Sequence, residues 1–271
     1  MIHYLAQGEG KPIVLIHGMT ASFHDWDSLM PAIASLGYRA FAPDLPGHGE
    51  SEIPQNPDFY TAENVFLALE NWLGSLKDSP PYILIGHSFG GYLSLSLALQ
   101  HPEWVRAMVL IDPLYSASQL PPQLSWLKRS TVAGTRALQG VPLSVMNRFM
   151  EFYAVYTGHL SKEACLQIAV DFKRASPYNL QILSELPDLT PELPKVQAPC
   201  LVIWGKEDRM LDPASFPLLI SRMPYASSFV VPKCGHQPHL CQPALINRLV
   251  ADFVQLDFQV RSTHLFSRQE S

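Results

Sequence analysis

Six short apolar runs recur along the chain, and each one ends abruptly in turn residues. They cover residues 13–16, 38–42, 82–85, 107–111, 201–204 and 228–231. Continuous apolar runs, in contrast to alternating ones, are typical of strands that are buried on both faces, as in parallel sheets covered by helices. Apolar residues at helical spacing lie between or beside these runs, over residues 26–36, 61–76, 90–100, 214–223 and 243–256. The pattern predicts a doubly wound α/β fold with a mostly parallel sheet.

One long segment interrupts this alternation. Residues 113–195 contain no convincing strand pattern and have the character of several short helices separated by prolines. A chain of 271 residues suits one domain with an insertion. We therefore predict an α/β core from residues 1–112 and 196–257, an inserted helical lid at 113–195, and a C-terminal tail at 258–271.

The predicted lid holds much of the aromatic content of the chain. Its aromatic residues are Trp126, Phe149, Phe152, Tyr153, Tyr156, Phe172 and Tyr178. These side chains are candidates to line a substrate pocket, but packing within the lid is the commoner role of an aromatic residue.

Composition narrows the class of protein. Apolar residues make up 47% of the chain and charged residues 16%, which is typical of a folded globular protein and excludes disorder over most of the chain. The 19 basic residues are dispersed and outnumbered by 24 acidic ones, so we expect no nucleic-acid partner and a small-molecule substrate.

The chain also carries no signal for export or membrane insertion. We find no signal-peptide pattern at the N-terminus and no apolar run near the roughly 18 residues that span a bilayer. The expectation is a cytoplasmic protein without a membrane span. Its four cysteines, Cys165, Cys200, Cys234 and Cys241, lack the spacing of a disulfide framework, so they are predicted to be free thiols.

The strongest motif is the pentapeptide Gly86-His87-Ser88-Phe89-Gly90, which follows the apolar run 82–85 and precedes a helical pattern. A sharp strand-to-helix turn holds its serine in a strained backbone conformation, and glycines on both sides leave room for the turn. The following helix directs its N-terminal amides at charge that develops near the serine oxygen. We predict that Ser88 is a catalytic nucleophile.

A serine nucleophile needs a base and a carboxylate that orients the base. In this fold the expected chain order is Ser, then Asp or Glu, then His. His236, after the last apolar run, is the predicted base, and Asp208, after the run before it, is the predicted acid. Glu207 and Asp112 are rivals for the acid, and Asp112 is the better of the two because it ends a neighbouring strand.

Acyl transfer also requires amide donors for the oxyanion of the tetrahedral intermediate. One predicted donor is the backbone N–H of Phe89, directly after the nucleophile. The second is expected in the loop after the run 13–16, with the N–H of Met19 as the best candidate.

The chain resembles the α/β-hydrolase superfamily, in its lid-bearing branch of esterases, lactonases and carbon–carbon hydrolases. The matching signatures are His17-Gly18, the segment from Asp44 to Ser51, Gly86-His87-Ser88-Phe89-Gly90-Gly91, the segment from Gly205 to Asp208, and the segment from Gly235 to His239. The resemblance implies that the segment from Asp44 to Ser51 is a structural turn without a catalytic role. It also implies that a further N-terminal strand, usual in this family, is either absent here or lies before a misplaced start.

A metal site is an alternative interpretation of the segment around His236. Cys234, His236, His239 and Cys241 are close in sequence, but their spacing differs from the usual zinc patterns. We therefore expect no metal and no cofactor.

The serine at the turn favours an acyl-enzyme over the alkyl-enzyme of aspartate-dependent relatives. The first hypothesis is hydrolysis of a small to medium, moderately apolar carboxylic ester, with thioesters and lactones as variants. Two alternatives stay open. One is a carbon–carbon hydrolase or lyase that uses the same triad, and the other is a small-molecule receptor of the same fold.

Overall fold

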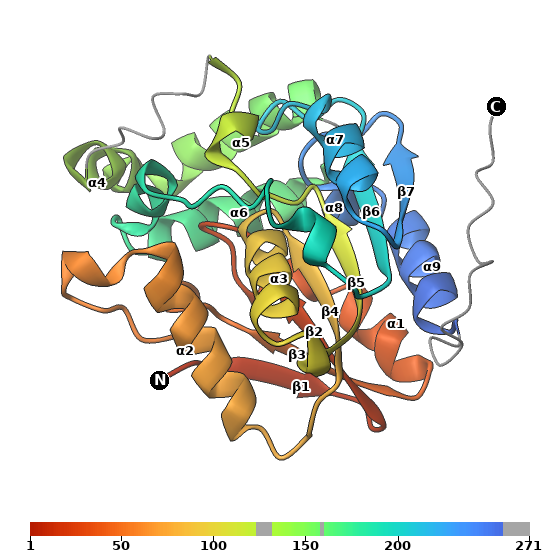
Figure 1. Ribbon diagram of the computed structural model, residues 1–271. Helices are drawn as coiled ribbons and strands as arrows, with labels where there is room; N and C mark the ends of the chain where they lie inside the picture. The colour runs from red at the N-terminus through yellow and green to blue at the C-terminus, as the bar shows by residue number, and fades with distance from the viewer. Residues whose placement is uncertain (123–131, 158–159, 257–271) are drawn as a thin grey trace.

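The computed structural model describes residues 1–122, 132–157 and 160–256, and it is built around one seven-stranded sheet (Figure 1). The strands are β1 (Tyr4–Gln7), β2 (Lys11–Ile16), β3 (Tyr38–Pro43), β4 (Tyr82–His87), β5 (Val105–Ile111), β6 (Cys200–Gly205) and β7 (Ala226–Val231). Their order in the sheet is β1-β3-β2-β4-β5-β6-β7, with β1 antiparallel to β3 and all other neighbours parallel. The predicted doubly wound fold is confirmed.

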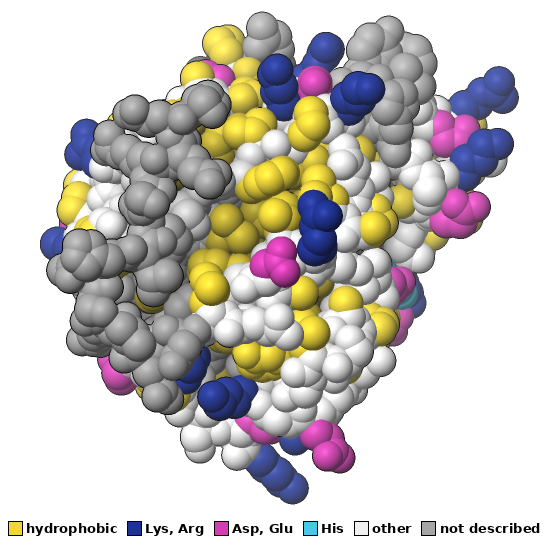
Figure 2. Space-filling view, turned by 90° about the vertical axis from the view of Figure 1, so that its right-hand side faces the viewer, with side chains coloured by type: hydrophobic (Ala, Val, Ile, Leu, Met, Phe, Trp, Pro, Cys, Tyr) yellow, Lys and Arg dark blue, Asp and Glu magenta, His cyan; other side chains and the backbone are white. Residues whose placement is uncertain are grey.

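All six predicted runs lie within strands, whereas β1 was missed. The four residues of β1 are exposed, so this edge strand lacks the continuous apolar run that marks a buried strand. At the opposite edge, β7 is also less buried than its sequence suggests, with Phe229 37% and Val230 41% exposed. Figure 2 views the molecule from the right-hand side of Figure 1, where β7 and α9 lie, and shows hydrophobic side chains gathered across this face.

Helices cover both faces of the sheet, as the burial of β2 requires. Ile13 and Leu15 pack on one face with α1 (Leu29–Ser35) and α9 (Pro243–Val254). Val14 and Ile16 pack on the other face, which is covered by α2 (Ala62–Ser75), α3 (Phe89–Gln100) and α7 (Ser215–Arg222). Each predicted helical pattern matches one of these helices to within three residues at either end, and the first residue of the pattern at 26–36, Trp26, is the last of a 3-10 turn, η1 (Phe23–Trp26).

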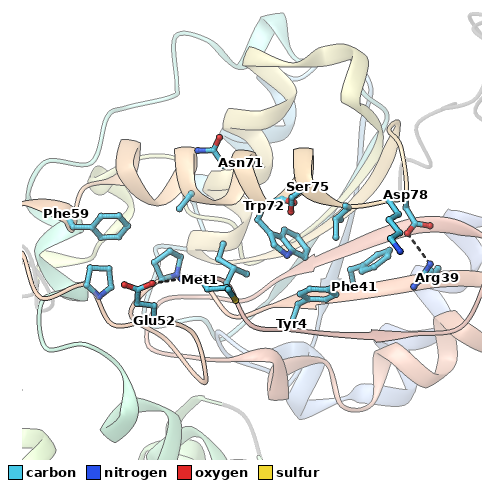
Figure 3. Close-up of a pocket in the computed structure, with 16 residues that line it drawn as sticks. Met1, Tyr4, Arg39, Phe41, Glu52, Phe59, Asn71, Trp72, Ser75 and Asp78 are labelled. Atoms are coloured by element: carbon cyan, nitrogen blue, oxygen red, sulfur yellow. Dashed lines mark hydrogen bonds and ion pairs between the residues drawn. The ribbon is translucent and has the colours of Figure 1, made fainter.

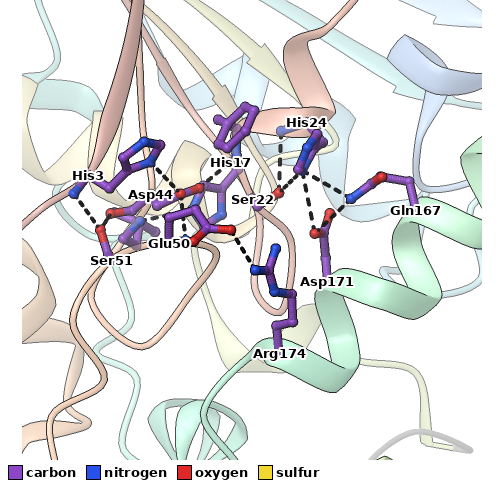
Figure 4. Close-up of polar contacts among 12 residues, drawn as sticks. His3, His17, Ser22, His24, Asp44, Glu50, Ser51, Gln167, Asp171 and Arg174 are labelled. Carbon is purple, nitrogen blue, oxygen red and sulfur yellow. Dashed lines mark hydrogen bonds and ion pairs between the residues drawn. The ribbon is translucent and has the colours of Figure 1, made fainter.

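After β5 the chain leaves the sheet, and it re-enters the sheet at β6, directly beside β5. Met108 of β5 pairs with Cys200 of β6. In between lie α4 (Val132–Gly140), α5 (Leu143–Thr157), α6 (Lys162–Arg174) and the 3-10 turns η4 (Ala117–Gln119), η6 (Asn179–Ser184) and η7 (Leu193–Lys195). The described part of residues 113–195 contains no strand. Gln167 and Arg174 of α6 contact His24 and Glu50, on the loops after β2 and β3, so α6 lies over the carboxyl ends of these strands (Figure 4).

The predicted lid aromatics have varied surroundings. Tyr178 stacks on Tyr60 of the core with ring centroids 5.4 Å apart, whereas Phe149 is 58% exposed. Trp126, the side chains of Phe152, Tyr153 and Tyr156, and the predicted tail at 258–271 lie outside the described residues.

The segment after β3 is a turn organised by one buried carboxylate (Figure 4). Asp44 accepts hydrogen bonds from the backbone N–H of Phe23 and Glu50, at 2.8 and 2.9 Å, and lies 3.0 Å from Nδ1 of His3. Its own carbonyl accepts a bond from the Ser51 hydroxyl. The turn therefore ties the loops after β2 and β3 together.

The prediction of four free thiols is wrong for two of them. Cys234 and Cys241 form a disulfide, while Cys165 and Cys200 are free and buried. The short helix α8 (Pro238–Cys241) turns the chain back, so the two Cα atoms lie 6.2 Å apart, within the usual range of a disulfide. Sequence spacing alone does not reveal this return. Among the described helices, none is both long and apolar enough to cross a membrane.

Candidate active site

Ser88 occupies the turn between β4 and α3. Its backbone has φ 50° and ψ −112°, a left-handed conformation that costs energy for a residue with a side chain. The turn is held by the Ser88 N–H, which donates to the carbonyl of Ile111, and by the Ser88 carbonyl, which accepts from Gly91 and Tyr92. Ser88 is thereby placed at the N-terminus of α3, where helix amides have no intrahelical acceptor.

The glycines beside Ser88 are required by close packing. A Cβ on Gly86 would lie 2.5 Å from the carbonyl oxygen of Gly90, and one on Gly90 would lie 2.0 Å from that of Ile16. Neither contact is possible for a real side chain, so α3 could not approach β2 and β4 as it does. Close packing of the turn thus explains why glycines stand two residues before and two residues after Ser88, as the sequence predicted.

The structure brings the three predicted catalytic side chains together from three separate loops. Nε2 of His236 lies 3.0 Å from Oγ of Ser88, and Nδ1 of His236 lies 2.8 Å from Oδ2 of Asp208. Asp208 follows β6 and His236 follows β7. The three groups therefore form a continuous hydrogen-bonded chain, in which a proton on Nδ1 leaves Nε2 free to accept the serine proton.

The second oxygen of Asp208 is also occupied. Oδ1 accepts the backbone N–H of Met210 at 2.7 Å and that of Leu211 at 3.1 Å. Burial of Asp208 raises the pKa of its carboxyl, but the charge and hydrogen bond of His236, with smaller contributions from Asp112 and the Leu211 N–H, outweigh burial and lower the pKa. The carboxylate is thus held ionised and fixed in orientation.

The two rival carboxylates have other partners. Glu207 accepts the backbone N–H of Cys234 at 2.9 Å and so links the loops that carry Asp208 and His236. Asp112 is fully buried and accepts the N–H of Gly205 at 3.0 Å. Burial, together with the charge of Asp208, raises the pKa of Asp112 well above its ordinary value. Neither rival hydrogen bonds to His236.

The predicted oxyanion donors flank Ser88. Phe89 is the first residue of α3, and Met19 belongs to the loop after β2. This loop lies directly against the nucleophile, since a Cβ on Gly18 would be 3.3 Å from Cβ of Ser88. Phe89 and the loop that carries Met19 therefore both lie next to Ser88.

His17 shapes this loop, a role that the sequence did not reveal. Its Nε2 accepts the N–H of Leu45 at 2.9 Å, so its Nδ1 carries the proton and donates to the carbonyl of Gly18 at 2.7 Å. The only sequence signal was its position before Gly18 in the family signature. His17 is fully buried and holds the loop in place from behind.

His87 and His239 were likewise given no role by the sequence. Nε2 of His87 donates to the backbone carbonyl of His236 at 2.8 Å, and the rings of His87 and His236 lie 5.0 Å apart. His239 packs against His87 with ring centroids 4.5 Å apart. The His236 ring thus packs against a layer of buried imidazoles.

Two cavities lie outside the triad. One, of about 830 Å³, is formed by β1, β3 and α2 around Tyr4, Arg39 and Trp72 (Figure 3). The other, of about 270 Å³, lies beneath α6 and is bordered by His24, Asp25 and His239. Neither is lined by Ser88, Asp208 or His236.

Comparisons with known proteins agree with this architecture. A sequence model described as alpha/beta hydrolase fold matches residues 11–243. The chain is 28% identical over 264 residues to a pimeloyl-[acyl-carrier protein] methyl ester esterase of Aeromonas hydrophila subsp. hydrophila, covering 91% of this chain and 96% of the relative. It is 27% identical over 267 residues to a 2-hydroxy-6-oxo-6-phenylhexa-2,4-dienoate hydrolase of Burkholderia cepacia, covering 93% and 91%.

A solved structure shares the fold at lower identity. It is a malate-bound thermophilic esterase from Thermogutta terrifontis, with a TM-score of 0.76 and 22% identity over 94% of this chain and 93% of that one.

Proposed function

Because this chain belongs to the α/β-hydrolase family, we propose that it hydrolyses a small to medium, moderately apolar carboxylic ester through an acyl-enzyme on Ser88. The observation that carries the proposal is the hydrogen-bonded chain from Oγ of Ser88 through the His236 ring to Asp208. The strained turn at Ser88 and the N-terminus of α3 beside it support the proposal, since helix amides at such a position can stabilise an oxyanion. The esterase relative from Aeromonas supports the same class of reaction.

The proposed reaction has two halves. Oγ of Ser88 attacks the ester carbonyl while Nε2 of His236 takes its proton, and the amides of Phe89 and Met19 stabilise the oxyanion. His236 then protonates the departing alcohol, which leaves an acyl-enzyme. A water molecule, deprotonated by His236, releases the acid and restores Ser88, while Asp208 stabilises the charged imidazole in both halves.

In this proposal the helical segment at 113–195 acts as a lid. Contacts of α6 with the loops after β2 and β3 support this, since these loops lie at the same edge of the parallel sheet as the loops of the proposed triad. The lid then selects the substrate, and its aromatic residues favour an apolar acyl or alcohol group.

The second candidate is cleavage of a carbon–carbon bond by the same triad. The similarity to the Burkholderia dienoate hydrolase favours it, because that relative matches over as much of the chain as the esterase does. A ketone would replace the ester as the group attacked.

The test is labelling of the purified protein with a fluorophosphonate, followed by 4-nitrophenyl esters of increasing acyl length and a 2-hydroxy-6-oxo-dienoate. Ser88→Ala is the test variant, and Ser96→Ala on the same helix is its control, since the Ser96 hydroxyl donates to the carbonyl of Tyr92 one turn back and does not belong to the triad. We expect labelling and ester turnover in the wild type and in Ser96→Ala, and loss of both in Ser88→Ala.

Four outcomes would change the conclusion. Folded wild-type protein that is not labelled would refute Ser88 as nucleophile, and ester turnover that persists in Ser88→Ala would refute the mechanism. Labelling with turnover of the dienoate alone would assign the second candidate. Labelling without turnover of any substrate would favour a receptor of this fold.

A further inference from the structure

Three buried side chains converge behind the catalytic histidine. They are Asp25 of η1, His87 at the end of β4 and His239 of α8, with exposed fractions of 6%, 3% and 3%. Oδ2 of Asp25 lies 3.5 Å from Nδ1 of His87 and 3.7 Å from Nε2 of His239. One ligand atom from each residue lies within 4.8 Å of the other two. The cluster shares no side chain with the triad.

The facing atoms of this cluster lack hydrogen-bond partners. Among the described residues, no group lies in hydrogen-bonding geometry with Oδ2 of Asp25, Nδ1 of His87 or either ring nitrogen of His239, and the contacts of Asp25 with the two rings are long ion pairs of 3.5 and 3.7 Å. A buried polar atom without a partner costs roughly 1–3 kcal/mol, so four of them in one place would be a large expense for a purely structural cluster. A group bound among Oδ2 of Asp25, Nδ1 of His87 and Nε2 of His239 would give three of these four atoms a partner.

The tautomer of His87 indicates the charge of that group. Nε2 of His87 faces the carbonyl oxygen of His236 at 2.8 Å, and a carbonyl only accepts, so Nε2 carries a proton. In the neutral ring Nδ1 then presents a lone pair, directed toward the carboxylate oxygen of Asp25. A lone pair that faces a carboxylate oxygen calls for a positive charge between the two atoms, and their separation of 3.5 Å exceeds that of an ordinary hydrogen bond that shares a proton, so the gap suits a metal ion.

The distances suit a transition-metal ion. Tetrahedral zinc with ligand bonds of about 2.0–2.2 Å holds its ligand atoms roughly 3.3–3.6 Å apart, close to the two distances from Asp25. Two imidazoles and one carboxylate suit zinc-like ions, whereas magnesium and calcium prefer sites made of oxygen atoms alone. His239 is further oriented by Trp26, whose ring stacks on it at 5.2 Å.

The cavity of about 270 Å³ beneath α6 supplies a route for the ion, since Asp25 and His239 are part of its wall. Its wall also includes the carboxyl groups of Asp27, Glu163 and Asp171, and no Lys or Arg among the described residues. Figure 4 shows two residues of this wall, Asp171 and Gln167 of α6, facing His24 of η1. Acidic walls of this kind raise the local concentration of cations.

We propose that Oδ2 of Asp25, Nδ1 of His87 and Nε2 of His239 bind one divalent transition-metal ion of the zinc class, with water from the cavity as a fourth ligand. The ion lies one imidazole away from the backbone of His236. It is a structural site beneath the triad and takes no part in the proposed ester chemistry. The sequence had discounted a metal among residues 234–241, and of those residues only His239 belongs to the proposed site.

The test is metal binding to the full chain after dialysis against a chelator. We expect one Zn²⁺ per chain by elemental analysis and calorimetric titration, a Tm that rises with added ZnCl₂, and no response to MgCl₂. With Co²⁺ in place of Zn²⁺, visible absorption bands report tetrahedral coordination in the wild type without any substitution.

Variants locate the ion. Asp25→Asn and His239→Gln should weaken Zn²⁺ binding by about 100-fold, since loss of a ligand costs no less than loss of a residue that orients one. His101→Gln is the matched control, because His101 pairs with Glu70 in a different part of the chain. His236→Gln tests the other cluster of possible ligands, Asp112, Asp208 and His236, and should leave binding unchanged.

Three results would overturn the proposal. They are a wild-type protein that binds no Zn²⁺ or Co²⁺, binding that is unchanged in both Asp25→Asn and His239→Gln, and binding that is lost in His236→Gln alone.

Discussion

The arrangement around Asp208 makes the effect of one substitution calculable. In Asp208→Asn, two backbone donors, from Met210 and Leu211, still point at the position of Oδ1. The amide oxygen must stay there, because an NH₂ group would face two N–H donors. The NH₂ group is therefore directed at Nδ1 of His236, which in the wild type lies 2.8 Å from Oδ2.

This reversal changes the tautomer of the base. Nδ1 of His236 must accept the bond from Asn, so the ring proton moves to Nε2, which faces Oγ of Ser88 at 3.0 Å. A protonated Nε2 cannot take the serine proton. In other serine hydrolases the same change lowers kcat by about 10⁴-fold, or roughly 5.5 kcal/mol of barrier, and we expect a loss of this order here.

The assay is the rate of fluorophosphonate labelling together with kcat for a 4-nitrophenyl ester. Asp112→Asn is the matched control, because it makes the same change in a neighbouring buried carboxyl that does not bond His236 and whose raised pKa already favours the neutral form. We expect Asp112→Asn to keep most of its activity. If Asp208→Asn retained more than about a tenth of the wild-type rate, or if both variants lost activity equally, the tautomer argument would be wrong.

Three further predictions concern stability. Folding raises the pKa of Asp112 above its value in the unfolded chain. The contribution of this carboxyl to the free energy of unfolding is therefore complete below the unfolded pKa and is lost as pH rises through the folded pKa. The Tm of Asp112→Asn should therefore rise relative to the Tm of the wild type as pH is raised from about 5 to 9. A Tm difference that stays constant over this range would refute the argument. Asp44→Ala leaves buried N–H donors without an acceptor and should lower the free energy of unfolding in urea by about 3 kcal/mol. Glu50→Ala is the control and should lower it by less than about 1 kcal/mol, because its ion pair with Arg174 is half exposed. Gly90→Ala should lower Tm strongly because its Cβ would meet the Ile16 carbonyl at 2.0 Å, whereas Gly74→Ala, with nothing within 4 Å, should raise it slightly; equal shifts would contradict the packing argument.

Much of this protein can be predicted from local patterns. A strand buried on both faces must be continuously apolar, so the runs at 13–16 and 82–85 identified their strands without any neighbour. The turn at Ser88 was equally local, because the glycines, the strand before them and the helix after them are contiguous. The sequence also named Asp208 and His236 by their order along the chain.

Tertiary structure decided which groups meet across the chain. Glu207, Asp112 and Asp208 were all eligible partners of His236, and only the packing of the loops after β6 and β7 gives Asp208 the bond. The Cys234–Cys241 disulfide depends on the turn of α8. Asp25, His87 and His239 lie far apart along the chain, so no local sequence pattern identifies their cluster. The three side chains meet only because the sheet brings the loops that carry them to the same edge.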